Sequence, residues 1–320
     1  EVGRQPWTIY GVLRTADSAS PVGAGQVSAS LLAFIVIYAI VFNVGVLYIL
    51  RLIAGGPNAE IVEPEGPRPP GYALAAANFW GRQPQTCVAV TGTNGKTSVA
   101  TFCRQIFQRL GHRSASMGTL GVTISDPFTG DQQITPPGLT TPDAADVAEL
   151  MAKVAAMGVT HMALEASSHG IDQRRLDGVQ LKAAGFLNLT QDHLDYHVTM
   201  ESYFAAKMAL FDRVLPEDGV AVVNLNDPHG ARVVEIAKAR GQRVLTVGHG
   251  AGCDLRLLGQ RYDATGQEVR FQWGGQPYQV RLNLIGGFQD ENVAVAAGLA
   301  ILNFVYGWFV LPETLAPENR

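Results

Sequence analysis

The chain is poor in cysteine and in charged residues, and both shortages narrow what it can be. Its 320 residues include only three cysteines, Cys87, Cys103 and Cys253, which stand far apart. That spacing suits neither a zinc site nor a disulfide framework, so we expect a reducing compartment, and we interpret Cys87 and Cys103 as buried packing residues. Charged residues make up 16% and the net charge is −4. No broad basic field is therefore available, and nucleic acid is not an expected partner.

One segment has no charge at all. This segment is the apolar run Leu31–Leu50 (LLAFIVIYAIVFNVGVLYIL). The nearest charged residue before it is Asp17, and the first charged residue after it is Arg51. As a helix it would be about 30 Å long, enough to cross the hydrocarbon core of a bilayer. It predicts a transmembrane helix at residues 31–53. A helix buried in a soluble protein is the alternative. A cleaved signal peptide fits less well, because the run is too long and no small-x-small pattern follows it.

Composition divides the chain into segments of different character. These are a polar segment 1–30, the predicted span 31–53, a Pro/Gly-rich linker 54–73, a globular segment 74–301 and a tail 302–320. In the globular segment, short apolar runs alternate with helical patterns. This alternation predicts an α/β fold with a mostly parallel sheet and helices on both faces.

Hydrophobic periodicity places the elements of the globular segment. Apolar runs predict buried strands at Thr86–Thr91, His161–Glu165, Gly185–Leu189, Val220–Asn224 and Arg243–Val247. Helical spacing predicts helices at Thr97–Leu110 and Ala144–Met157. Residues Asp254–Leu284 alternate between apolar and polar with two Gly-containing turns, which predicts an antiparallel meander at one edge of the sheet.

The sharpest motif joins the first of these strands to the first helix. The sequence TGTNGKTS runs from a strand into a Gly-rich loop and then into an amphipathic helix, which is the context of a phosphate-binding loop. Glycines let backbone N–H groups approach phosphate oxygens, Lys96 can neutralise the β- and γ-phosphates, and Thr97 is placed to bind magnesium. The motif is not a strict Walker A, because Val90 stands where that pattern has its first glycine; a chance turn before a helix is the alternative. The residues expected to bind ATP are Gly92, Thr93, Asn94, Gly95, Lys96, Thr97 and Ser98.

Together with three later segments, GTNGKT resembles the Mur ligase family, which includes folylpolyglutamate synthetases. The segments are LTTPD (Leu139–Asp143), LEASSHGIDQRR (Leu164–Arg175) and NLTQDHLDYHVTMESYFAAK (Asn188–Lys207). They look like those members that add the third peptide residue to UDP-N-acetylmuramoyl-L-alanyl-D-glutamate. The resemblance covers about Leu74 to Ile301, the central ATP-binding domain. It implies an ATP- and Mg²⁺-dependent ligase of peptidoglycan synthesis that joins an acid to an amino acid through an acyl-phosphate.

The resemblance implies roles for single residues. Glu165, at a strand end, would hold magnesium with Thr97; without the resemblance it could be a solvated cap. His193 would bind a second magnesium. Without the resemblance, His193 and His197 would suggest zinc, but no third soft ligand accompanies them, and we interpret His197 as structural or surface. Lys207 would carry a carbamate that binds magnesium, which a free ammonium could not do; alone it would be interpreted as a solvated charge.

Further positions match contacts to the substrates. Thr140, Thr141, Ser167, Gln173 and Arg175 would hold the UDP-muramoyl-dipeptide, because hydroxyls and an amide suit sugar and phosphate oxygens and arginine suits an anion. Asn292 would read the adenine edge. The incoming amine would be meso-diaminopimelate or lysine. The sequence leaves that choice open, with diaminopimelate favoured by analogy alone.

The two ends resemble other families. EVGRQPW and LRTA resemble the C-terminal end of subunit I of the cytochrome bd quinol oxidase, where Glu1 would be a haem ligand. No haem site is expected, because the rest of that helical bundle is not seen. The tail FVYGWFVLPETLAPENR resembles drug/proton antiporters of the major facilitator type.

These resemblances, with Glu1 in place of an initiating methionine, lead us to expect a fragment or a chimera of three unrelated pieces. The expected protein is a cytoplasmic ligase domain, tethered to the membrane through residues 31–50. Its turnover would be impaired because the family's N- and C-terminal domains are not recognised. Two alternatives are a nucleotide-binding fragment without turnover and a membrane fragment of the oxidase.

Overall fold

The computed structural model describes residues 7–9, 13–14, 32–38, 42, 69, 71–136, 138–192 and 194–310. The chain divides into two units, Glu1–Glu65 and Gly66–Arg320. In the first unit, strands β1 (Trp7–Ile9) and β2 (Leu13–Arg14) pair antiparallel, and residues 32–38 are helical. Most of the predicted membrane helix 31–53 lies outside the described residues. Within the described ranges, no helix combines the length and the apolar character needed to cross a membrane.

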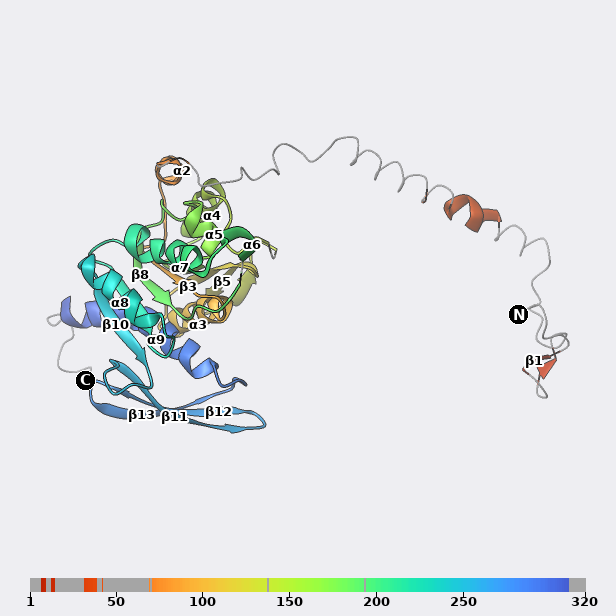
Figure 1. Ribbon diagram of the computed structural model, residues 1–320. Coiled ribbons are helices and arrows are strands. Elements are labelled where there is room, and N and C mark those ends of the chain that lie inside the picture. Colours follow the sequence, from red (N-terminus) through yellow and green to blue (C-terminus); the bar gives the residue numbers. More distant parts are fainter. Residues whose placement is uncertain are drawn as a thin grey trace. The chain divides into compact units, whose positions relative to one another are not determined.

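One large sheet organises the second unit (Figure 1). Its strands are β3 (Thr86–Thr91), β4 (Ser114–Gly118), β5 (Gly121–Asp126), β6 (Gly130–Gln133), β7 (His161–Glu165), β8 (Leu181–Phe186), β9 (Val220–Asn224), β10 (Arg243–Gly248), β11 (Leu255–Asp263), β12 (Gly266–Trp273) and β13 (Gln276–Leu282). They lie in the order β13-β12-β11-β10-β9-β8-β3-β7-β4-β5-β6. From β11 to β4 neighbouring strands are parallel, as predicted.

Both edges of the sheet are antiparallel. β11, β12 and β13 form the meander predicted for residues 254–284. At the opposite edge, β5 and β6 continue from β4 as a second antiparallel extension, which the sequence did not predict. β5 mixes buried with half-buried residues and β6 is largely exposed, so neither gives the continuous apolar run from which the central strands were recognised.

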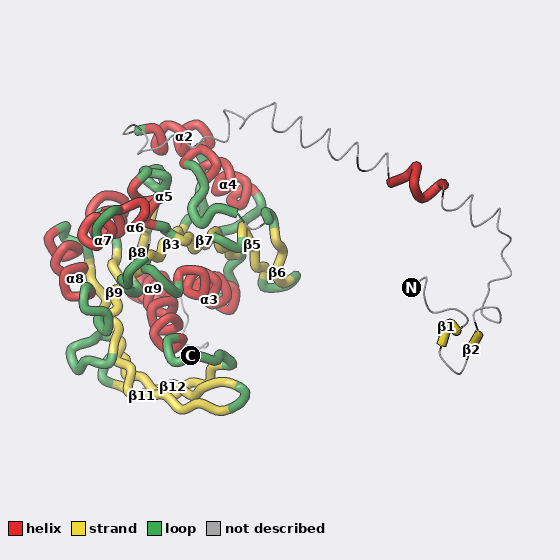
Figure 2. Tube along the Cα trace, turned by 45° about the vertical axis from the view of Figure 1, so that its right-hand side comes forward, coloured by secondary structure: helices red, strands yellow, loops and turns green. Residues whose placement is uncertain are grey.

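Helices cover both faces of the sheet (Figure 2). They are α2 (Tyr72–Trp80), α3 (Lys96–Arg109), α4 (Ala144–Ala156), α5 (Ser168–Asp172), α6 (Leu194–His197), α7 (Met200–Ala209), a π-helical turn η1 (Leu210–Val214), α8 (Gly230–Ala239) and α9 (Gln289–Val310). β3 shows how the two cores divide: Cys87 and Ala89 face the core formed with α4, α5, α7 and α8, whereas Val88 and Val90 face the core formed with α3 and α9.

Cys87 and Cys103 are fully buried, as expected. Burial raises the pKa of the Cys87 thiol to about 12, which keeps it protonated and unreactive.

Two boundaries differ from the expectation. The strand predicted at Gly185–Leu189 is β8, which in fact begins at Leu181. The prediction began too late because the exposed Lys182 interrupts the apolar pattern that marks a buried strand. The chain leaves the sheet after Phe186. In addition, α9 runs through residue 310 and so crosses the predicted boundary between segments 74–301 and 302–320.

Parallel pairing brings three chain turns to one edge of the sheet. β3 lies between β7 and β8, and the carboxyl ends of all three point the same way. Chain connections diverge to either side of β3, which makes this edge a topological switch point, the usual location of a ligand site in such folds.

Candidate functional site

The glycine-rich loop lies between β3 and α3 and needs its glycines for space. Gly95 caps α3 with a φ of 90°, and a Cβ built there would lie 2.6 Å from Oδ1 of Asn292. A Cβ on Gly92 would lie 2.8 Å from Cβ of Leu187. The loop therefore packs closely against α9 on one side and against the chain after β8 on the other, and it ends at the amino terminus of α3. A helix amino terminus favours anions, so this geometry supports a phosphate cradle.

Two lysines converge on this loop. Lys96 Nζ donates to the carbonyl oxygens of Gly92 (2.9 Å) and Thr93 (2.8 Å). Lys207, on α7, donates from Nζ to the same Gly92 oxygen at 2.9 Å and lies over the ring of Tyr203. The side chain of Lys207 is only 1% exposed. Burial, assisted by the charge of Lys96, lowers the pKa of Lys207 to about 7. Burial also lowers the pKa of Lys96.

Glu165 ends β7 directly beside the loop. Its carboxylate accepts hydrogen bonds from Thr97 Oγ1 (2.9 Å), from the Thr119 amide (3.1 Å) and from Thr119 Oγ1 (3.3 Å). Burial raises its pKa in spite of these donors. A Cβ on Gly118 would overlap the carboxylate, so only glycine leaves room for it there. Glu165 and Thr97, which were predicted to hold magnesium together, are thus hydrogen-bonded to each other, and their shared role as magnesium ligands stays a prediction.

These two residues fit a magnesium ion in part. Mg²⁺ is commonly held by one or two protein oxygens, with phosphate oxygens and water completing the octahedron. Thr97 Oγ1 and the Glu165 carboxylate would supply such oxygens. His193, predicted to hold a second ion, lies outside the described residues. Among the residues that are described, no group of three or more His, Cys, Asp or Glu side chains could hold a metal by itself.

Asn188 is a loop contact that the sequence analysis did not single out. It follows β8, and its side chain accepts from the Asn94 amide (2.9 Å) and donates to the Asn94 carbonyl (3.2 Å). Its own carbonyl accepts from the Thr93 amide at 3.0 Å. Its place at the start of the segment Asn188–Lys207, which resembles the family, was the available signal. Thr119, which binds Glu165, gave no comparable pattern.

The residues predicted to hold the muramoyl-dipeptide lie in the same region. Thr140 Oγ1 is 3.0 Å from Thr119 Oγ1. Thr141 is buried, and its hydroxyl donates to the Glu165 carbonyl (2.9 Å) and accepts from Ser167 Oγ (3.0 Å). These contacts connect Thr140, Thr141 and Ser167 to the strand end that carries Glu165.

Gln173 and Arg175 form the inner part of this network. Arg175 is 6% exposed and donates from Nη1 to the Thr141 carbonyl (2.7 Å) and from Nε and Nη2 to Gln173 Oε1 (3.1 and 2.6 Å). In this structure, Arg175 therefore orders the segment that carries the threonines. Contact of these residues with a substrate stays a prediction.

His197 and Asn292 complete the expected set. His197 is buried on α6 between the rings of Tyr196 and Tyr203, which agrees with a structural role. Asn292 lies near the start of α9, 5% exposed, and its Nδ2 donates to Gln289 Oε1 at 3.2 Å. Its place beside Gly95 brings it close to the loop, while its predicted contact with adenine remains untested.

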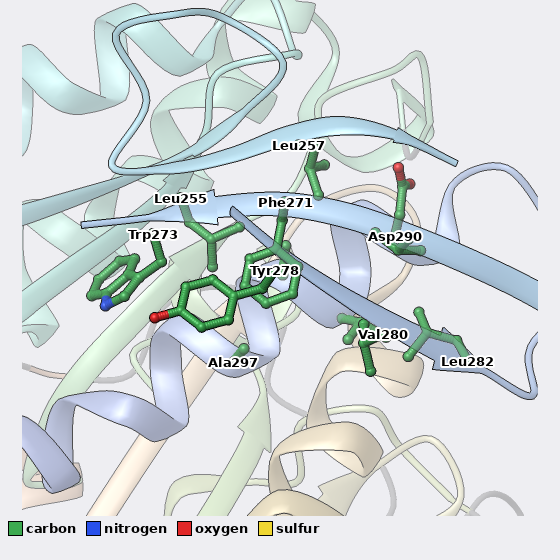
Figure 3. A pocket seen from close by; sticks show the side chains of 12 residues that line it. Leu255, Leu257, Phe271, Trp273, Tyr278, Val280, Leu282, Asp290 and Ala297 are labelled. Atoms are coloured by element: carbon green, nitrogen blue, oxygen red, sulfur yellow. The ribbon is translucent and has the colours of Figure 1, made fainter. Parts of the chain in front are cut away.

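An apolar hollow of about 370 Å³ lies elsewhere, between β11–β13 and α9 (Figure 3). Its wall includes Phe271, Trp273 and Tyr278, and Asp290 is the one charged residue among those that line it. A wall of that kind offers no cation for phosphate groups. Among the described residues, the groups that suit phosphate binding therefore lie at the loop rather than in this hollow.

Comparisons with known proteins identify the families that the chain resembles. Residues 90–300 match the Mur ligase middle domain, and residues 1–57 match subunit I of the cytochrome bd terminal oxidase, which confirms the resemblance inferred for the amino end. The resemblance of the tail to antiporters stays a prediction.

The UDP-N-acetylmuramoyl-L-alanyl-D-glutamate–2,6-diaminopimelate ligase of Caulobacter vibrioides is 57% identical over 246 residues, which are 77% of this chain and 50% of that protein. A solved structure of a ligase with the same name superposes with a TM-score of 0.65 at 30% identity, covering 73% of this chain and 47% of that one. The folylpolyglutamate synthase of Mycobacterium tuberculosis, complexed with ADP, has a TM-score of 0.58 at 19% identity and covers 73% of this chain and 58% of that one, which shows the shared fold.

The chain thus spans about half the length of the curated relatives it matches. The family match itself covers most of the chain and includes the loop, both lysines and Glu165. The chain belongs to the Mur ligase family, through its middle domain.

Proposed function

We propose that this chain provides the ATP-binding and phosphoryl-transfer centre of a ligase that joins meso-diaminopimelate to UDP-N-acetylmuramoyl-L-alanyl-D-glutamate. One observation carries the proposal. Lys96, Thr97, Glu165 and Lys207 meet around the Gly92 loop at the carboxyl edge of a parallel sheet. The names of the Caulobacter protein and of the similar solved structure support diaminopimelate, rather than lysine, as the amine.

The residues divide the work of phosphoryl transfer between them. In the proposed complex, the start of α3 holds the phosphates, and Lys96 turns from its own loop carbonyls to the β- and γ-phosphate oxygens. Thr97 and Glu165 would hold Mg²⁺, which would neutralise phosphate charge when bound. Transfer of the γ-phosphoryl group to the substrate carboxylate needs little beyond alignment and neutralisation of charge. The amine then attacks the acyl carbon of this acyl-phosphate: a C–N bond forms, the C–O bond to phosphate breaks, and inorganic phosphate and a proton are released.

Lys207 suits the carbamate that the family resemblance implies. Only an uncharged amine can attack carbon dioxide, and a pKa of about 7 leaves a large neutral fraction near neutral pH. Carbamylation would replace one of two neighbouring cations with an anion, which removes their repulsion and offers an oxygen ligand toward magnesium. His193 would complement this ligand set.

The substrate residues follow from the same proposal. Thr140, which is hydrogen-bonded to the Glu165 partner Thr119, would contact the dipeptide. Thr141, Gln173 and Arg175 would hold the segment that carries Thr140 in place. Asn292 would read the adenine edge from α9.

Calorimetry tests the nucleotide site first. Wild-type chain should bind Mg-ATP, and Lys96→Ala should lose binding because a cation that would neutralise the β- and γ-phosphates is removed. Equal affinity of the two proteins would refute the phosphate loop.

Radiolabelled diaminopimelate with UDP-muramoyl-dipeptide, with the Caulobacter relative as positive control, then tests the ligation. Because turnover is expected to be impaired, the intact chain should give no measurable tripeptide; ATP binding without acyl-phosphate formation from UDP-muramoyl-dipeptide would favour a nucleotide-binding role instead.

A further inference from the structure

The phosphate loop is fastened to the segment that follows β8 by a set of hydrogen bonds. Thr93 donates from its amide to the Asn188 carbonyl (3.0 Å) and from Oγ1 to the Thr190 carbonyl (3.1 Å), and it accepts at Oγ1 from the Thr190 amide (2.9 Å). Asn94 is bound by the side chain of Asn188. This half of the loop is therefore held from outside β3 and α3.

The side chain of Asn188 binds the backbone of Asn94 at two points, as the backbone of a neighbouring strand would. Its Oδ1 accepts from the amide of Asn94 while its Nδ2 donates to the carbonyl of the same residue. A carboxamide carries both an acceptor and a donor, so it can bind the backbone N–H and the C=O of one residue at once. We call these two hydrogen bonds between Asn188 and Asn94 the clasp. Because Asn94 is exposed to solvent, its backbone position in the described structure is fixed by the clasp rather than by packing.

The clasp also decides which amides are available to a ligand. The N–H groups of Thr93 and Asn94 both point to the Asn188 side and are already bonded. The first N–H groups of a helix have no carbonyl partner within the helix. At the start of α3 these belong to residues 95–98, which follow the clasp directly.

We propose that Asn188 is a positioning residue for ATP. It holds the loop so that the amides of residues 95–98 face the phosphates, while those of Thr93 and Asn94 are committed to Asn188. The inference rests on the proposed function, because it concerns the same nucleotide. Its physical basis is preorganisation: a loop fixed before binding loses less conformational entropy when the ligand arrives.

The test compares Asn188 with a matched residue. Gln83 makes the same kind of clasp at the opposite, amino ends of the same two strands: its Nε2 donates to the Gly178 carbonyl (2.8 Å) and its Oε1 accepts from the Gln180 amide (3.0 Å). Asn188→Ala should weaken Mg-ATP binding by roughly 10- to 30-fold, since two net hydrogen bonds are lost. Gln83→Ala should leave the dissociation constant unchanged, although both variants lower the melting temperature.

Asn188→Asp is a second variant, which keeps the test decisive if Asn188→Ala does not fold. It is nearly isosteric and keeps the bond from the Asn94 amide, so the melting temperature should stay near that of wild type. It loses the donation to the Asn94 carbonyl and adds a negative charge near the phosphates, so the dissociation constant should still rise.

The outcomes separate the two ideas. Failure of wild-type chain to bind Mg-ATP would remove the proposed function. Binding by wild type with equal affinity in Asn188→Ala would overturn the positioning role alone. Equal weakening in Asn188→Ala and Gln83→Ala would also overturn it, because the effect would then report general stability.

Discussion

Lys207 gives the sharpest prediction, because a buried lysine makes the stability of the fold depend on pH. Its ammonium is fully enclosed, and its pKa falls from 10.5 to about 7. In the unfolded chain the pKa returns to its ordinary value, so between these two values the unfolded state binds more protons than the folded state. Stability therefore rises with pH across this window and is lost as the pH falls toward 7.

The magnitude follows from proton linkage. With folded and unfolded pKa values of about 7 and 10.5, raising the pH from about 7 to about 9 stabilises the fold by roughly 2 kcal/mol through this one group. Lys207→Met removes the group and keeps most of the side-chain volume. We therefore expect the difference in unfolding free energy between wild type and Lys207→Met to change by about 2 kcal/mol in favour of wild type across this pH range.

Urea denaturation followed by circular dichroism at both pH values measures this difference. The buffers should be free of carbon dioxide, so that carbamylation does not consume the neutral amine. Lys182→Met, at an exposed lysine on β8, is the matched control and should show no pH-dependent difference. A wild-type to Lys207→Met difference that is the same at both pH values would refute the argument that burial lowers the pKa of Lys207.

Three further predictions concern the site and its supports. Glu165→Gln should remove the magnesium-dependent part of ATP affinity, measured by calorimetry with and without a chelator; an unchanged magnesium dependence would contradict the assigned role. Gly118→Ala should destabilise the fold by about 1–3 kcal/mol in urea, because its Cβ overlaps the Glu165 carboxylate, whereas Gly138→Ala, which meets no neighbour, should be neutral. Asp143→Ala should cost about 1 kcal/mol in thermal unfolding, because the Asp143 side chain caps α4 at the Ala145 amide, and Asp143→Asn should restore most of the loss.

The sequence alone determined the local elements that carry the site. A buried strand, a glycine-rich loop and an amphipathic helix are encoded within residues 86–110, because hydrophobic periodicity and glycine spacing are local properties. The central strands β3, β7, β9 and β10 were recognised for the same reason. β4, β5, β6 and the first half of β8 were missed, since exposed or polar residues in these segments remove the pattern that marks a buried strand.

Only the tertiary structure decided how distant residues meet. Glu165 lies far from Thr97 in the chain, and parallel pairing of β3 with β7 brings them to 2.9 Å. The convergence of Lys96 and Lys207 on one carbonyl oxygen, and the depressed pKa that follows, depend on burial by elements from the whole domain. Asn188 opens a segment that resembles the family, but its contact with the loop exists only where the chain after β8 lies against the loop after β3. Contacts of this kind are set by strand order and register, which no local pattern specifies.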